Sequence, residues 1–492
     1  MIAIKRRAGL ALIVGPMNDL ATAPRETPAA PIEGALVVDA DLIRKYGGNG
    51  PRYTSYPTAD RFIDAFDGNA YRHWLGARSI GGFSRPLGLY VHVPFCDTLC
   101  FYCACNKIAT RDHAKSHRYV AAVAREAKLV AEALGDDRRV SRVHWGGGTP
   151  TFLGDEESAR LMGALRANFD LDPQGEYAIE VDPRRVGPER IAFLARLGFN
   201  RISVGVQDFD PEVQRAVNRI QGVGETRAVI DAARANGFRS VNVDLIHGLP
   251  KQTAAGFSET LERVVECAPD RIALYAYAHL PAVFKPQRRI VAADLPSAQV
   301  KLELMTLAIR RLEKAGFVHI GMDHFARAGD ELAVAQRQGR LIRDFQGYST
   351  GGERDLVGLG VSAIGKIGPA YAQNVKTLED YYAALDGGEL PVMRGIEAKP
   401  DDLARRAVIQ ALACDLAVSK SSIGIAHLLD FDTYFAAELD ELAGLAADGL
   451  VELDDEWIQV TPRGRLLVRA VCMVFDRYLR ETRERSRYSR VM

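Results

Sequence analysis

Six short runs rich in β-branched residues alternate with amphipathic stretches between Leu87 and Leu280, and this alternation constrains the fold most strongly. The pattern is typical of repeated βα units with a parallel sheet. We expect strands at 87–93, 140–145, 176–181, 201–206, 240–246 and 271–276, and helices at 116–133, 155–168, 188–197, 226–236 and 254–267. Strands that are apolar on both faces need helical cover outside and a filled interior. The sequence therefore predicts an α/β fold with an open (β/α)6 barrel, and an open doubly wound sheet is the alternative.

Polar or glycine residues stand at or near the end of every predicted strand. They are Cys96, Gly146–Thr149, Glu180, Gln207, Asp244 and Tyr277–His279. The carboxyl ends of the strands form the active face of a parallel barrel. Six strand ends with such residues on one rim favour a catalytic barrel over a structural one.

The cysteines are clustered, because Cys96, Cys100, Cys103 and Cys105 lie within ten residues of one another. The first three have the spacing C-x3-C-x2-C, which supplies three thiolates to a [4Fe-4S] cluster and leaves the fourth iron open for S-adenosylmethionine (SAM). Cys105 as a fourth ligand would limit the cluster to electron transfer. A zinc knuckle is the other interpretation of the spacing. The remaining cysteines, Cys267, Cys414 and Cys472, are expected in the core.

The glycine-rich turn after the second strand is a candidate for contact with SAM. Glycine lets a backbone approach a ligand closely, and the amides of Gly146–Thr149 could bind the methionine part of SAM. Glu180, Gln207 and Asp244 are further candidates, against the simpler interpretation that they are capping or rim residues. Arg219 falls in a helix–loop region, where a solvated charge is the usual finding.

The whole-chain composition excludes some classes of protein. Hydrophobic residues make up 47% and charged residues 26% of the 492 residues, which indicates a globular chain. The formal net charge is zero, so no overall field attracts nucleic acid or an anionic membrane. The apolar run at residues 8–14 is too short for a membrane span, and we expect translation to start at Met17.

The domain organisation follows from changes in pattern along the chain. We expect an N-terminal extension at 1–47 that is partly disordered, a segment over the barrel mouth at 48–85, the barrel at 86–375 and a mostly helical domain at 376–492. The last domain has helices at 377–385, 400–414, 432–448 and 464–479 and a hairpin at 450–460. Such a module can resemble a winged helix. Because residues 430–455 are acidic, a lid or packing role is favoured over DNA binding.

Nine stretches carry a resemblance to a known family. They are PRYTSYPTA (51–59), YVHVPFCDTLCFYCACNK (90–107), HWGGGTPT (144–151), QDF (207–209), DLIHGLP (244–250), YAHLP (277–281), MDHFA (322–326), FQGYST (345–350) and GLGVSAIG (358–365), with the end Tyr488–Met492. From about Leu42 onward the chain resembles the oxygen-independent coproporphyrinogen III oxidases, which are radical SAM enzymes. It departs from that family at Ala104, where glycine is usual, and in its N-terminal extension.

The resemblance implies the site residues and the reaction. Cys96, Cys100 and Cys103 would ligate the cluster, and Cys105 would not. Tyr90, Gly147, Glu180 and Ile364 would surround a first SAM, with Glu180 and Tyr90 expected to be catalytic. A second SAM would contact Tyr102, Gly148, Thr149, Gln207, Arg219, Asp244 and Ala278. The implied reaction converts two propionates of coproporphyrinogen III to vinyl groups through a 5'-deoxyadenosyl radical, giving protoporphyrinogen IX for heme synthesis.

Partners and alternatives follow from the same resemblance. We expect a cytoplasmic monomer that uses a low-potential donor such as flavodoxin or ferredoxin and an unknown terminal electron acceptor, without nucleic acid. Arg52, Tyr53 and Tyr56 are expected to contact the tetracarboxylate substrate, against simple packing on the barrel. A heme-chaperone relative is one alternative, and a non-catalytic metal-binding or winged-helix module is another. A thiyl radical on Cys105 is the alternative to direct hydrogen abstraction from the substrate.

Overall fold

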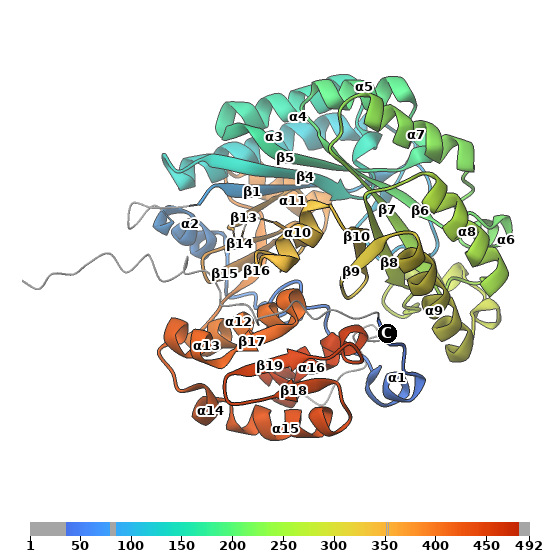
Figure 1. Cartoon of the computed structure of the whole chain (residues 1–492). Helices are drawn as coiled ribbons and strands as arrows, with labels where there is room; N and C mark the ends of the chain where they lie inside the picture. Colours follow the sequence, from blue (N-terminus) through green and yellow to red (C-terminus); the bar gives the residue numbers. More distant parts are fainter. Residues whose placement is uncertain (1–35, 79–84, 351, 353, 482–492) are drawn as a thin grey trace, which may run out of the picture.

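A twelve-stranded sheet forms the centre of the computed structural model, which describes residues 36–78, 85–350, 352 and 354–481 (Figure 1). The expectations for residues 1–35 and for Tyr488–Met492 lie outside these ranges. All six predicted strands are present as parallel neighbours: β1 (Leu87–Val93), β4 (Arg139–Gly147), β5 (Asp170–Val181), β6 (Arg201–Gln207), β7 (Ser240–His247) and β8 (Arg271–Ala276).

Further strands extend the sheet at both edges, and the sequence did not predict them. Strand β13 (Leu356–Leu359) pairs parallel to β1, and β14 (Ile364–Ile367), β15 (Ala370–Asn374) and β16 (Val392–Glu397) follow in antiparallel order. At the opposite edge β10 (His324–Arg327) pairs antiparallel to β8 and to β9 (Phe317–Gly321). The barrel therefore stays open, flanked by antiparallel strands.

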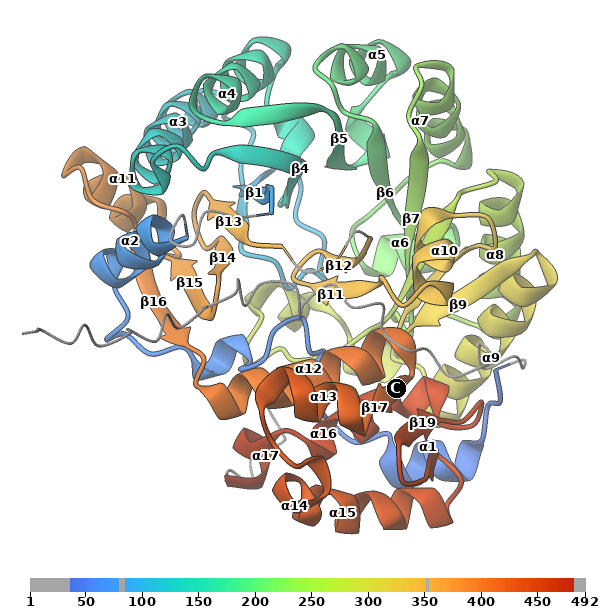
Figure 2. The ribbon, with the colours of Figure 1, turned by 60° about the vertical axis from the view of Figure 1, so that its left-hand side comes forward.

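Helices cover the outer face of the curved sheet, as Figure 2 shows. They are α3 (Lys115–Leu134), α4 (Asp155–Asn168), α5 (Pro188–Arg196), α7 (Val223–Ala235), α8 (Ala254–Glu266) and α9 (Ala298–Lys314), and the short α6 (Pro211–Ala216) follows β6. A doubly wound sheet would carry helices on both faces. The arrangement confirms the partial barrel.

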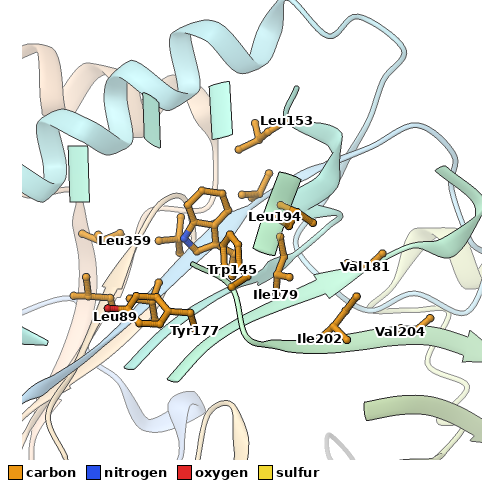
Figure 3. Close-up of a cluster of buried hydrophobic side chains, with 14 of the residues drawn as sticks. Leu89, Trp145, Leu153, Tyr177, Ile179, Val181, Leu194, Ile202, Val204 and Leu359 are labelled. Atoms are coloured by element: carbon orange, nitrogen blue, oxygen red, sulfur yellow. The ribbon is translucent and has the colours of Figure 1, made fainter. Parts of the chain in front are cut away.

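Side chains alternate along the barrel strands between the apolar outer layer and a polar interior. Trp145 points outward, is fully buried and contacts the ring of Phe199 edge-on with centroids 5.0 Å apart (Figure 3). Its neighbour His144 and the next inward residues, Glu180 and Asp244, are polar. The expectation of strands apolar on both faces was therefore wrong for the inner face. Loss of the Trp145 side chain would cost about 3–5 kcal/mol.

The C-terminal unit has a separate core. It contains α12 (Pro400–Asp415), α13 (Lys420–His427), α14 (Phe431–Tyr434), α15 (Ala436–Ala447), α16 (Val468–Val474) and α17 (Arg477–Glu481), with a small sheet of β17 (Ala417–Ser419), β18 (Val451–Leu453) and β19 (Trp457–Val460). The expected boundary at residue 376 falls too early, because α11 (Leu378–Asp386) packs in the barrel core and β16 belongs to the large sheet.

The N-terminal segment joins both cores. It includes α1 (Ala40–Tyr46) and α2 (Gly68–Ala77). Tyr53 is buried in the C-terminal core and its hydroxyl donates to Asp476 Oδ2 over 3.0 Å. Ile63 forms a two-way backbone bridge to Gly395 on the edge strand β16, with N–O distances of 2.7 and 3.1 Å.

The remaining described α-helix and strands are short. They are α10 (Glu331–Arg337), the paired strands β11 (Ile342–Asp344) and β12 (Gly347–Ser349), and the paired strands β2 (Phe95–Cys96) and β3 (Ile108–Ala109). No helix within the described ranges is long and apolar enough to cross a membrane.

A buried carboxyl on α3 holds the turn between β13 and β14. Glu126 accepts hydrogen bonds from Gly360 N over 2.7 Å, from Asn374 Nδ2 over 2.6 Å and from the Tyr381 hydroxyl. Desolvation raises the pKa of Glu126 to about 7, although these three donors oppose the shift. The carboxyl therefore titrates near neutral pH in the folded protein.

This titration predicts a pH-dependent contribution to stability. Because its pKa is about 7 when folded and about 4.3 when unfolded, Glu126 binds more protons in the folded state between those values. Its contribution is fully present below the unfolded pKa and is lost as pH rises through about 7. We expect the melting temperature of wild type relative to Glu126→Gln to fall between pH 5 and pH 8. A difference that is constant over this range would contradict the assignment.

Candidate active site

The loop that follows β1 carries the clustered cysteines and is closed at its base. Strands β2 and β3 pair there, with Ile108 N donating to Pro94 O over 2.7 Å and Thr110 N donating to Cys96 O over 2.9 Å. Cys96 and Cys100 are buried, and Cys103 is half-buried. The closed loop therefore presents three thiols from one short segment.

Donor groups surround the sulfur atoms of two of these cysteines. Thr149 Oγ1 lies 3.5 Å from Cys96 Sγ, and the guanidinium groups of Arg219 and Arg184 lie 3.5 and 3.7 Å from Cys100 Sγ. Hydroxyl and cationic donors stabilise thiolate sulfur and tune the potential of an iron–sulfur cluster. The surroundings of these sulfurs fit such a cluster.

The spacing of the thiols also bears on the kind of metal. In the part of the chain that the structure describes, no three His, Cys, Asp or Glu side chains converge as ligands of a single ion. A cubane binds each cysteine through a different iron, so its ligands need not meet at one point. The arrangement is compatible with a cluster ligated by Cys96, Cys100 and Cys103.

Cys105 lies beside this group on the exposed side of the loop. Its thiol hydrogen-bonds to Cys103, which is the largest cause of a Cys103 pKa lowered to about 6. Lys107 Nζ donates to the carbonyl oxygens of Cys103 and Cys105 over 3.0 and 3.2 Å. Cys105 thus supports the loop around Cys103.

The glycine turn packs against the cysteine loop, and three of its amides donate to groups of the chain itself. Gly147 N donates to Glu180 Oε2 over 3.1 Å, Gly148 N to Val93 O over 2.8 Å and Thr149 N to Phe95 O over 2.8 Å. The amides of these three residues therefore have partners within the chain in this structure. Glycine lets this turn pack closely against the cysteine loop, because a Cβ on Gly148 would lie 2.8 Å from the backbone of Pro94.

A row of inward side chains links this turn to the barrel strands. His92 Nε2 lies 2.9 Å from the carbonyl oxygen of Asn106, so Nε2 carries the proton and Nδ1 accepts from the Tyr90 hydroxyl over 3.0 Å. Burial lowers the pKa of His92 and raises that of Tyr90 well above its ordinary value. Both groups are therefore neutral near pH 7. On the next strands Glu180 Oε1 lies 3.1 Å from His144 Nε2.

Strands β13 and β14 connect Ile364 to this row of side chains. Gly358 on β13 is the partner of Tyr90 on β1. A Cβ on Gly358 would lie 2.6 Å from the Ile364 carbonyl oxygen on β14. The structure thus places Ile364 two strands away from Tyr90, with Gly358 between them, although the sequence did not predict the strand that carries it.

Arg219 is buried at the heart of the site, so the simpler interpretation of a solvated charge is wrong. Its guanidinium contacts Asp182 Oδ2 at 3.3 Å and donates to Gly205 O over 2.6 Å. Its Nε atom is buried without a hydrogen-bond partner among the described residues. A Cβ on Gly205 would lie 3.0 Å from both Arg219 Nη2 and Gln207 Nε2, so these two side chains lie over the same glycine.

Asp244 lies inside the barrel and is held by two short contacts. Ser203 Oγ and Asn242 Nδ2 donate to its carboxylate oxygens, each over 2.9 Å. Burial, followed by the charge of Glu180, raises the pKa of Asp244 to about 6. The charge of Glu180 therefore disfavours the ionisation of Asp244 in the barrel interior.

Two site residues are joined by a residue that the sequence analysis missed. Gln287 Nε2 donates to the carbonyl oxygens of Tyr102 and Ala278, each over 3.1 Å. Asp182 and Arg184 were also missed. Asp182 stands two positions after Glu180 at the end of β5, which could have indicated it, but Gln287 lies in a short 3-10 helix (Lys285–Arg289) without a comparable signal.

The three expected substrate contacts divide between two places. Arg52 lines a cavity of about 50 Å³ beside Asp323 and His247, with Arg52 Nη1 2.8 Å from Asp323 Oδ2. Tyr53 and Tyr56 are instead buried in the C-terminal core. The expectation that their rings face the substrate was therefore wrong, because they pack against residues more than 400 positions away.

Comparison with known proteins agrees with this geometry. Residues 90–264 match the radical SAM superfamily, and residues 398–467 match the HemN C-terminal domain. The oxygen-independent coproporphyrinogen III oxidase of Pseudomonas aeruginosa is 49% identical over 92% of this chain and 98% of its own length, and that of Escherichia coli K12 has the same identity and shares.

A solved structure extends the likeness to three dimensions. Coproporphyrinogen III oxidase (HemN) from Escherichia coli, described as a radical SAM enzyme, superposes with a TM-score of 0.86 and 48% identity, covering 91% of this chain and all of that one. With a partial barrel, a closed three-cysteine loop and this likeness along nearly its whole length, the chain belongs to the oxygen-independent coproporphyrinogen III oxidase family of radical SAM enzymes.

Proposed function

We propose that this chain catalyses the oxygen-independent oxidative decarboxylation of two propionates of coproporphyrinogen III to vinyl groups, giving protoporphyrinogen IX in heme biosynthesis. The observation that carries the proposal is the closed cysteine loop at the barrel mouth, in a chain about half identical to oxidases of that name. The test is anaerobic reconstitution with iron and sulfide, followed by product analysis with SAM, a reductant and coproporphyrinogen III. Absence of protoporphyrinogen IX would contradict the proposal.

Cys96, Cys100 and Cys103 would hold the [4Fe-4S] cluster. When bound, the cluster and SAM supply the one-electron chemistry that yields a 5'-deoxyadenosyl radical for hydrogen abstraction. The chain's own part is to orient and to exclude water. Thr149, Arg184 and Arg219 approach the cysteine sulfurs with a hydroxyl and two cations, which favours an electron-accepting site.

The residues that line the inner face of the barrel suit two molecules of SAM. We assign Tyr90, Gly147, Glu180 and Ile364 to the first, because Glu180 can meet the ammonium group beside the cysteine loop. Glu180 and Tyr90 would thus orient the reacting molecule. The second would contact Tyr102, Gly148, Thr149, Gln207, Arg219, Asp244 and Ala278, where the unpartnered Nε of Arg219 can donate to a carboxylate.

The propionates of the substrate are anionic and need a cationic side chain to bind them. Arg52 is the candidate for this contact. Asp323 is flanked by Arg52, His324 and Arg343, which hold its pKa far below the ordinary range. Positive charge therefore exceeds negative charge in this cluster, which favours a further carboxylate.

Arg52→Gln tests this assignment. We expect the KM for coproporphyrinogen III to rise about tenfold, because a charge-assisted hydrogen bond contributes ~1.5–3 kcal/mol. SAM cleavage without substrate should be unchanged. In the control Arg239→Gln, on the surface, both the KM for coproporphyrinogen III and SAM cleavage should stay at wild-type values. Equal loss of both activities in Arg52→Gln would indicate a folding defect and contradict a substrate role.

The cellular setting is also a proposal. An oxygen-sensitive cluster suits a reducing compartment, which favours the cytoplasm, and a low-potential protein such as flavodoxin or ferredoxin would supply electrons. We expect a monomer, which size-exclusion chromatography of the reconstituted enzyme can check.

A further inference from the structure

The cysteine loop is held between two surface segments. On one side Phe101 N donates to Val217 O over 2.9 Å. On the other side Gln287 Nε2 donates to Tyr102 O over 3.1 Å, and the Arg289 guanidinium lies 5.3 Å from the centre of the Phe101 ring. Both segments are therefore in direct contact with the residues between Cys100 and Cys103.

The second segment exposes a concentration of positive charge. Lys285, Arg288 and Arg289 are all exposed, and none of them forms an ion pair with another described residue. Residues 281–291 contain no Asp or Glu. Elsewhere on this neutral chain many surface arginines are paired, as Arg215 is with Glu212. The three cations thus create a local positive field beside the cysteine loop.

Apolar side chains accompany these cations on both sides of the loop. Ile220 is 61% exposed, Val283 67% and Val291 59%, which places them among the most exposed large hydrophobic residues described. We call these residues with Lys285, Arg288 and Arg289 the flanking patch. Exposed apolar residues grouped with arginine are typical of protein interfaces. A small molecule would need a concave, enclosing site instead.

We propose that the flanking patch is the docking surface for an acidic, low-potential electron-transfer protein of the flavodoxin or ferredoxin class. The inference rests on the proposed function, because a reducible cluster held by the cysteine loop is the destination of the electron. One electron leaves the carrier's reduced flavin or iron–sulfur centre and enters the cluster for each SAM cleaved. Such encounters are small and steered by charge, so three cations that form no ion pair with a described residue, together with a few apolar contacts, suit one.

The experiment compares two reductants on the reconstituted enzyme. The double variant Lys285→Glu/Arg288→Glu, which leaves the contact of Arg289 with Phe101 in place, is measured for SAM cleavage with reduced flavodoxin and, separately, with dithionite. The control Arg239→Glu reverses an exposed cation just before β7, at the amino end of the parallel strands, whereas the cysteine loop follows the carboxyl end of β1. We expect the flavodoxin-driven rate of the double variant to fall at least tenfold at low salt, while its dithionite-driven rate and the control stay at wild-type values. Added salt should slow the wild type with flavodoxin and hardly affect the variant.

Each other result contradicts the inference in a distinct way. Equal losses with both reductants would mean that Lys285 and Arg288 support the cluster and do not dock a carrier. Unchanged flavodoxin rates, or a wild type that accepts electrons from neither flavodoxin nor ferredoxin, would remove the docking role. A raised KM for coproporphyrinogen III with dithionite would make the patch a substrate site. Failure of the proposed function itself would appear separately, as SAM cleavage without porphyrinogen turnover in the wild type.

Discussion

Replacing Cys96, Cys100 or Cys103 by serine is expected to abolish turnover, lowering it by at least roughly a thousandfold. Each thiol would ligate a different iron, so no remaining ligand can substitute for the lost one. Cys105 cannot take the place of a lost ligand, because it lies on the exposed side of the loop. Absorption near 400 nm and the iron content of the anaerobically reconstituted protein measure the cluster.

Cys105→Ser and Cys267→Ser are the matched controls for this series. We expect both to retain the cluster, and Cys105→Ser to turn over more slowly because its contact with Cys103 is weakened. A complete [4Fe-4S] signal in any of the three ligand variants would show that the assignment is wrong. Loss of the cluster in Cys105→Ser would instead make that residue a ligand.

Glu180→Gln is expected to lower SAM cleavage about a hundredfold while leaving the cluster intact. The glutamine side chain has nearly the shape of glutamate and still reaches Gly147 N and His144 Nε2. It lacks the negative charge that would hold an ammonium group. A hydrogen bond between charged groups contributes up to ~3 kcal/mol, which corresponds to that factor. SAM affinity measured by equilibrium dialysis should fall in parallel.

Glu176→Gln is the control for Glu180, because it changes an inward carboxyl on the same strand. Glu176 pairs with Arg201 at 3.6 Å, away from the strand end. We expect nearly normal SAM affinity in this variant. Equal losses in both variants would mean that the barrel interior, and not a specific contact, was disturbed.

The sequence predicted those parts of the molecule whose signal is local. The six barrel strands and their outer helices follow from apolar periodicity, and the strand ends carry the polar residues that the structure gathers around the cysteine loop. Strand β13 is four residues long, fully buried and contains Gly358, so it has no alternating pattern. Arg219 is buried because Asp182 and Gly205 from two other strand ends meet it, which no local pattern indicates.

The two-way bridge between Ile63 and Gly395 also has a consequence for biosynthesis. The N-terminal segment leaves the ribosome first, yet it pairs with a strand more than 300 residues further on, and Tyr53 meets Asp476 only 423 positions later. At ~5–20 residues per second the segment waits roughly 20–85 seconds for this last partner. During that time the barrel can form without it, and on completion of the chain the segment covers the free edge of β16. This edge would otherwise be open to pairing with another nascent chain.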